Sequence, residues 1–88
     1  MALSFPNQSR SFDATRRAVR FWGYDSAMEA SFFVEAAALR RLAPGIQANE
    51  AGFLEAFDLN RDLIYAAANN IYCRGRKGSY DLTLSDFC

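Results

Sequence analysis

The sequence contains no histidine, which removes the commonest general base and the commonest metal ligand from this chain of 88 residues. Cysteine is almost as scarce. Cys73 and Cys88 are too few for a disulfide scaffold, and their spacing is not that of a zinc site. No nucleophile is accompanied by a base. We therefore expect a protein that is not an enzyme and that uses no metal and no other cofactor.

Long apolar runs are also lacking. No stretch approaches the ~20 apolar residues that a membrane-spanning helix needs, and the chain does not begin with the basic and apolar segments of a signal peptide. We expect no membrane contact and a cytoplasmic location. Ten basic residues balance ten acidic residues, so no net charge draws the whole molecule toward nucleic acid. These absences narrow the function without defining it.

The composition that remains is that of one globular domain, with 51% hydrophobic and 23% charged residues. A chain of this length supports a single core. Residues 1–15 are mostly polar, and we interpret them as an N-terminal arm that is extended or irregular. Residues 16–88 then form a single α+β domain.

The segment "RRAVRFWGYDSAMEASFFVE" over residues 16–35 predicts a β-hairpin, because it is rich in aromatic and β-branched residues around a polar break. A turn at Asp25 and Ser26 would pair Phe21 with Ala30. One face of this hairpin is apolar and should face the core. It carries Val19, Phe21, Gly23, Met28, Ala30, Phe32 and Val34, and the other face carries Arg20, Trp22, Tyr24, Glu29, Ser31 and Phe33.

The rest of the chain predicts two helices and a strand. "EAAALRRLAPG" indicates a short helix that ends at Pro44 and Gly45, and apolar spacings of three and four indicate a long helix from Glu50 to Arg74. "SYDLTLSDF" over residues 79–87 alternates like a half-buried strand. The predicted fold class is α+β, in two layers, with both helices on one face of a small antiparallel sheet that the arm could extend.

Arg20, Trp22, Tyr24 and Phe33 form the candidate interaction face, on the side of the hairpin away from the core. Three uses fit such an aromatic surface. The arm could cover Trp22, a protein partner or a second copy of the chain could pack on the face, or single-stranded bases could stack on it. Glu29 on the same face argues against bases. These alternatives stay open at the level of sequence.

Cations gather in "YCRGRKGSY" over residues 72–80, where Arg74, Arg76 and Lys77 form a candidate anion-binding loop. The favoured interpretation is structural, because glycines and cations after a helix cap its C-terminus. The segment matches neither a phosphate loop nor a dinucleotide fingerprint. If nucleic acid binds, three further cations would contact phosphates, namely Arg16, Arg17 and Arg20.

Two other groups of residues have ordinary explanations. Asp58 and Asp62 lie one helical turn apart, but with Arg61 beside them they indicate a solvated helix face. Cys73 and Cys88 should be free thiols, because a returning strand separates them by roughly 25 Å at ~3.3 Å per residue.

Three segments together resemble the small bacterial proteins grouped as domain of unknown function 1488, and they span nearly the whole chain. They are "LSFPNQSRSFDATRRAVRFWGYD", "FFVEAAALRRLAPG" and "FDLNRDLIYAAANNIYCRGRKGSYDLTLSDF". The resemblance implies a bacterial domain of mixed helix and sheet and supplies no site residue. Our leading hypothesis is a non-enzymatic protein-interaction or regulatory module, with a homodimer among its forms; weak binding of single-stranded nucleic acid is the alternative.

Overall fold

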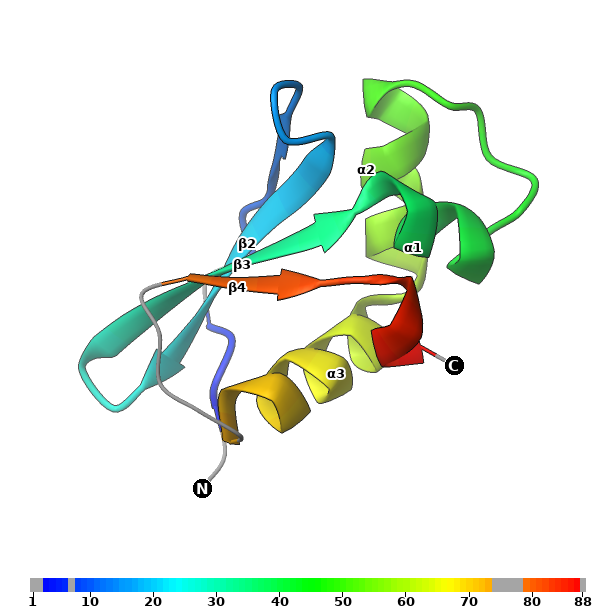
Figure 1. Cartoon of the computed structure of the whole chain (residues 1–88). Helices are drawn as coiled ribbons and strands as arrows, with labels where there is room; N and C mark the ends of the chain where they lie inside the picture. Colours follow the sequence, from blue (N-terminus) through cyan, green and yellow to red (C-terminus); the bar gives the residue numbers. More distant parts are fainter. Residues whose placement is uncertain (1–2, 7, 74–78, 88) are drawn as a thin grey trace.

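Four strands form a single sheet in the computed structural model, which describes residues 3–6, 8–73 and 79–87 (Figure 1). Three helices separate the third strand from the fourth, so the predicted α+β class is confirmed. Within the described residues, no helix combines the length and the apolar character needed to cross a membrane. The elements are β1 (Ser11–Asp13), β2 (Ala18–Asp25), β3 (Met28–Glu35), α1 (Ala36–Leu42), α2 (Glu50–Leu59), α3 (Arg61–Cys73), β4 (Ser79–Leu82) and the 3-10 helix η1 (Leu84–Phe87).

The sheet is mixed, with the strand order β1-β2-β3-β4. β1 and β3 run antiparallel to β2, whereas β4 runs parallel to β3. An entirely antiparallel sheet was expected from the sequence. The difference arises because the three helices carry the chain back along the sheet before β4 begins, and a long crossover of this kind is what a parallel pair requires.

The hairpin has the predicted faces but a different register. Met28, which was expected to face the core, is 63% exposed at the end of the hairpin. Phe21 pairs with Phe32 rather than with Ala30, and the turn contains Ser26 and Ala27. The predicted pairing was therefore wrong by two residues. An even shift leaves every side chain on its predicted face, because side chains alternate along a strand with a period of two.

The predicted long helix is divided at Asn60 into α2 and α3. The Asn60 backbone lies outside the helical region, with φ −123° and ψ 26°. Its side-chain amide donates to the Ala56 carbonyl over 3.0 Å, and its backbone N–H donates to Phe57 instead. The side chain thus takes the acceptor that the next helical hydrogen bond would use, which is why asparagine interrupts helices.

The last predicted strand is shorter than expected and ends at Leu82. Asp86 accepts from the Thr83 backbone N–H over 2.7 Å, and the Asp86 N–H donates to the Thr83 carbonyl over 3.0 Å. The first of these bonds is the half of a capping box in which the N3 carboxylate binds the N-cap N–H, and the second is the backbone bond of the 3-10 turn. Leu84, expected in the strand, is 40% exposed in η1. The spacing of Thr83 and Asp86 was a signal for a helix start that the alternating pattern obscured.

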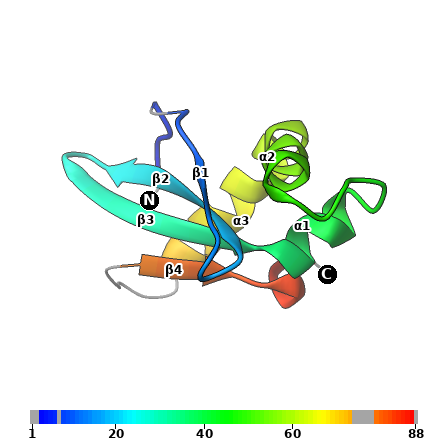
Figure 2. The same ribbon diagram turned by 90° about the horizontal axis from the view of Figure 1, so that it is seen from above.

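One apolar core lies between the sheet and the helices. Figures 1 and 2 show α3 below the strands and α2 beside α1 at one end of the sheet. Phe21 lies at the centre of an aromatic group, and its ring centroid is 5.1–5.8 Å from those of Phe57, Phe32 and Tyr65. The largest fully buried side chains are Phe21, Phe32, Phe53, Phe57, Leu39, Ile64, Leu82, Val19 and Val34.

The N-terminal arm packs along the body of the protein. Ser4 forms a two-hydrogen-bond bridge with Tyr24, which extends the edge of β2 beyond β1. Arm residues from Leu3 to Arg10 contact one face of α3 and the end of α2. Each later arm residue contacts a position about one helical turn earlier in the helices. These contacts are Leu3 N–H to Asn69, Phe5 on Tyr65, the Gln8 carbonyl to Arg61 and Arg10 to Asp58.

Candidate interaction face

The four residues of the candidate interaction face come from neighbouring strands. Arg20, Trp22 and Tyr24 alternate along β2 with the buried Val19, Phe21 and Gly23. Phe33 of β3 lies directly opposite Arg20 in the hairpin register. The structure therefore brings together all four residues on the side of the sheet away from the core. Their role in binding stays a prediction.

Arginine side chains lie over the rings of this face. The Arg16 guanidinium carbon is 3.9 Å from the centroid of Phe33, which is only 7% exposed. The Arg20 guanidinium carbon is 5.2 Å from the Trp22 ring. Both distances are within the range of cation–π attraction. Arg16 also forms an ion pair of 2.7 Å with Asp81 of β4, so it spans the face from one ring to the neighbouring strand.

Hydrogen bonds across the strands hold the polar groups of the face in place. The Tyr24 hydroxyl donates to a Glu29 carboxylate oxygen over 2.7 Å, and Arg20 donates to the Ser31 hydroxyl over 3.1 Å. Each bond joins β2 to β3. The result is a face with a basic region around Arg16 and Arg20 and an acidic residue, Glu29, toward the hairpin turn.

Neither aromatic residue of the arm covers Trp22. Phe5 stacks on Tyr65 with a centroid distance of 4.0 Å, and Phe12 stacks on Phe53 at 5.5 Å. Both arm aromatics therefore pack on the core side of the sheet, and cover of Trp22 by them, the first of the three uses considered above, is wrong. Trp22 is half-buried on the face of the sheet that lies away from the core.

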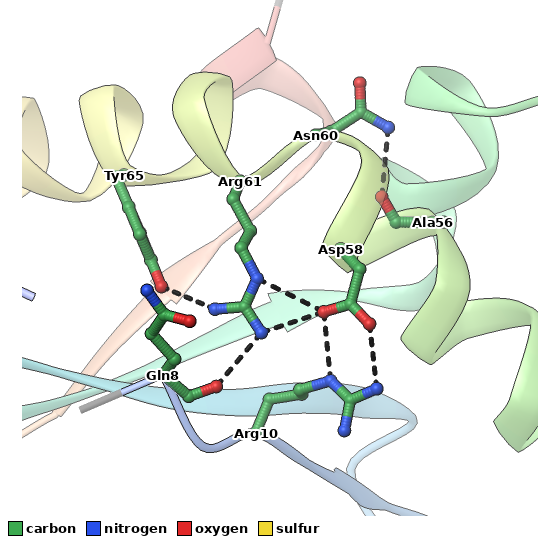
Figure 3. A network of polar contacts seen from close by, with 7 residues as sticks. All are labelled: Gln8, Arg10, Ala56, Asp58, Asn60, Arg61 and Tyr65. Carbon is green, nitrogen blue, oxygen red and sulfur yellow. Dashed lines mark hydrogen bonds and ion pairs between the residues drawn. The ribbon is translucent and has the colours of Figure 1, made fainter.

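A cluster around Asp58 was missed by the sequence analysis, which placed this residue on a solvated helix face. Arg10 donates two hydrogen bonds to the two Asp58 carboxylate oxygens, of 3.0 and 2.8 Å, and Arg61 donates to the same carboxylate over 2.8 Å (Figure 3). Arg61 also donates to the Tyr65 hydroxyl and to the Gln8 carbonyl. No local pattern pointed to Arg10, because 48 positions separate it from Asp58. The cluster fastens the arm to the junction of α2 and α3.

These arginines lower the pKa of Asp58, chiefly through the hydrogen bond from Arg10 and against the opposing effect of burial. A lowered pKa means that the carboxylate stabilises the fold above its unfolded pKa of about 3.9 and loses this contribution as the pH falls through the folded value. Asp58→Asn should lower the free energy of unfolding at pH 7 by up to about 1 kcal/mol. In urea unfolding, the difference in the free energy of unfolding between the wild type and Asp58→Asn should become smaller as the pH falls below about 4.

Glu55→Gln is the matched control for this change, because Glu55 is an exposed carboxylate of the same helix, and no ion pair involves it in the described part of the chain. It should leave stability nearly unchanged. An Asp58→Asn effect that is equally large at pH 3 would contradict the assignment, since the unfolded wild type is then largely protonated at this residue and the contribution of the ionised carboxylate should already have decreased.

The candidate anion-binding loop of Arg74, Arg76 and Lys77 lies outside the described residues, as do Cys88 and the side chain of Cys73. Binding by the loop and the two free thiols therefore stay predictions.

The fold and the face define a small α+β domain. The chain matches the family model described as "Protein of unknown function (DUF1488)" over residues 3–84, and it belongs to this family. It is also similar in structure to a protein of unknown function from the DUF1488 family of Shewanella loihica PV-4, known from a crystal structure at 1.60 Å resolution. The TM-score is 0.79 at 19% identity, over 92% of this chain and 91% of that chain, which shows a shared fold. A search of curated proteins finds no match.

Proposed function

We propose that this protein is a non-enzymatic interaction module that self-associates through the candidate interaction face. One observation carries the proposal: Phe5 and Phe12 pack on the core side of the sheet, which leaves Trp22 on the opposite side without cover from either ring. Aromatic surface of this kind on a small domain usually marks a protein contact.

The charges of the face favour a second copy as the partner. Arg20 and Arg16 lie near Phe33, whereas Glu29 lies opposite Tyr24, in the pair next to the closing pair Asp25 and Met28 of the hairpin. In a two-fold symmetric contact, each surface meets itself in the reverse direction. The basic region of one copy would then face Glu29 of the other, and Trp22 would lie between them.

A charge exchange tests this arrangement directly. Arg20→Glu and Glu29→Arg should each weaken the dimer, because each places like charges against one another. The double variant should restore it. Light scattering over a range of concentrations measures the association, and circular dichroism checks that each variant is folded. If the double variant is no better than the single variants, the two-fold arrangement is wrong.

Trp22→Glu should also give a monomer, because it places a charge at the centre of the contact. The control is Leu63→Glu, since Leu63 is 57% exposed next to the 70% exposed Leu59, an apolar surface on the helices. Trp22 is the single tryptophan of the chain, so its fluorescence reports on the face alone. A wild-type monomer with an already buried Trp22 ring would exclude self-association, and loss of the dimer in Leu63→Glu would move the contact to the helices.

The alternative of single-strand binding has its own support in Arg20, which lies beside Trp22 as a cation beside a stacking ring. Arg16 and Arg17 would contribute contacts to phosphates. On this alternative, affinity for a short single-stranded oligonucleotide should fall steeply between low and moderate salt. Absence of binding at low salt would end the alternative without affecting the test of self-association.

A further inference from the structure

A shallow hollow of about 280 Å³ lies where the connection between β1 and β2 meets the start of α1. Three of its lining residues are arginines, and they come from two separate parts of the chain. Arg16 and Arg17 precede β2, and Arg40 lies on α1. The remaining lining residues are Glu35, Ala36 and Ala37.

The arginines of the hollow are only partly neutralised. Arg16 pairs with Asp81, which lies outside the lining. Arg17 and Arg40 form no ion pair with any residue in the described parts of the chain. The lining therefore contains three arginines and a single carboxylate, Glu35, and two of the arginines, Arg17 and Arg40, have no ion pair within the described residues. Like charges held together by the fold are a common feature of anion sites, because the guanidinium fork matches the oxygens of phosphate or carboxylate.

The backbone of Arg17 is a second and independent observation. Its φ of 52° lies in the left-handed region, where a side chain is unfavourable and glycine is preferred. The Arg17 carbonyl accepts a hydrogen bond of 2.9 Å from the Ala36 N–H, which fastens this residue to the start of α1. Glycine could make the same backbone bond without strain. Strained residues of this kind cluster at functional sites, and the presence of arginine where glycine would be unstrained is a reason to test its side chain for a role.

We propose that this hollow binds the phosphate group of a small phosphorylated ligand. The lining holds three arginines and one carboxylate, and Asp81 pairs with Arg16 from outside it, so an excess of one positive charge remains. A phosphate monoester, with a charge of about −1.5 to −2 near neutral pH and several oxygens for the guanidinium forks of Arg17 and Arg40, fits this excess better than a carboxylate does. The volume is below the ~300–1,000 Å³ of pockets that enclose whole drug-sized ligands. The site thus recognises the phosphate and leaves the rest of the ligand outside. This proposal goes beyond the self-association above and does not depend on it.

The test is a titration of the isotope-labelled protein with inorganic phosphate at low ionic strength, followed by the NMR signals of the Arg17 and Ala36 amides. The chemical shifts of these two amides should change as phosphate is added and should reach a plateau when the site is saturated. Arg40→Gln and Arg17→Gly should each weaken binding about tenfold or more, the loss of one or two charge-assisted hydrogen bonds. Arg17→Gly should remain folded, and in urea it should be more stable than the wild type, since it relieves the backbone strain.

Two control variants separate the site from general effects. Arg41→Gln removes the same charge at the next position of α1 but outside the lining of this hollow, and it should change the affinity less than twofold. Ser26, in the turn between β2 and β3, also has a left-handed backbone, with φ 56°. Ser26→Gly relieves this strain away from the hollow and should leave phosphate binding unchanged. Acetate should bind more weakly than phosphate.

Three results would overturn the proposal: no saturable shift at tens of millimolar phosphate, equal losses in Arg41→Gln and Arg40→Gln, or equal affinities for acetate and phosphate. None of them bears on the Trp22 contact, because light scattering of the same variants measures that contact separately.

Discussion

Phe21→Ala is expected to lower the free energy of unfolding by about 3–5 kcal/mol, the largest effect of any single change considered for this protein. Phe21 is 1% exposed, and its ring contacts aromatic rings from four parts of the chain. Their centroids lie 5.1 Å away for Phe57, 5.3 Å for Phe32, 5.8 Å for Tyr65 and 6.3 Å for Phe5. Truncation removes the shared contact of the sheet, α2, α3 and the arm.

The size of this effect follows from how little the surroundings can collapse. Rings held by a sheet on one side and two helices on the other cannot move together to fill the space, so the cavity cost adds to the lost burial. Total stabilities of domains are only about 5–15 kcal/mol, so the variant should lose much of its stability. Urea unfolding followed by circular dichroism measures the change. Leu63→Ala, at an apolar residue that is 57% exposed, is the control and should change stability little.

Gly52→Ala is expected to destabilise the protein by about 1–3 kcal/mol, although alanine is normally the better helix former. Gly52 lies in the first turn of α2, and its N–H donates to the Asn49 side chain over 2.8 Å. A methyl group at Gly52 would collide with the Gln47 carbonyl oxygen and lie 2.8 Å from its carbonyl carbon. These are backbone atoms just before the helix cap, so they cannot rotate away as a side chain could.

Gly45→Ala is the matched control for this prediction. A methyl group at Gly45 would meet no atom within 4 Å, and its backbone does not have a positive φ. The same chemical change should therefore be neutral or stabilising by up to about 1 kcal/mol, since alanine restricts the unfolded chain. Equal unfolding midpoints for Gly52→Ala and Gly45→Ala would show that the segment before α2 yields easily and that the close approach at Gly52 has no cost.

Comparison of the hairpin with the helices shows where sequence reasoning succeeded. The alternation in residues 19–34 placed the two sets of hairpin side chains on opposite faces, because a face depends only on odd and even positions. Register needs the turn itself, and Ser26 and Ala27 carry no strong turn signal, so the pairing was off by two residues. The division at Asn60 was hidden because the apolar spacing continues through it, from Phe57 to Ile64.

The candidate sites divide in the same way. The candidate interaction face could be predicted because all four of its residues belong to one hairpin. The alternation of side chains along the two strands places them on the same face. The Asp58 cluster and the phosphate hollow join residues that are far apart in the chain: Arg10 with Asp58, and Arg17 with Arg40. Contacts of this kind depend on how the arm and the helices pack, which no local spacing records.

The sequence by itself determined the α+β class, the apolar and polar faces of the hairpin and the lack of histidine chemistry, because composition and periodicity act within a few residues of one another. Only the tertiary structure decided that β4 runs parallel to β3, that Phe5 and Phe12 turn toward the core, and that three arginines meet in one hollow. These outcomes depend on competition among distant surfaces for burial. The N-terminal arm pairs with the edge of β2 while its aromatic side chains reach the core, so Trp22 remains on the opposite face.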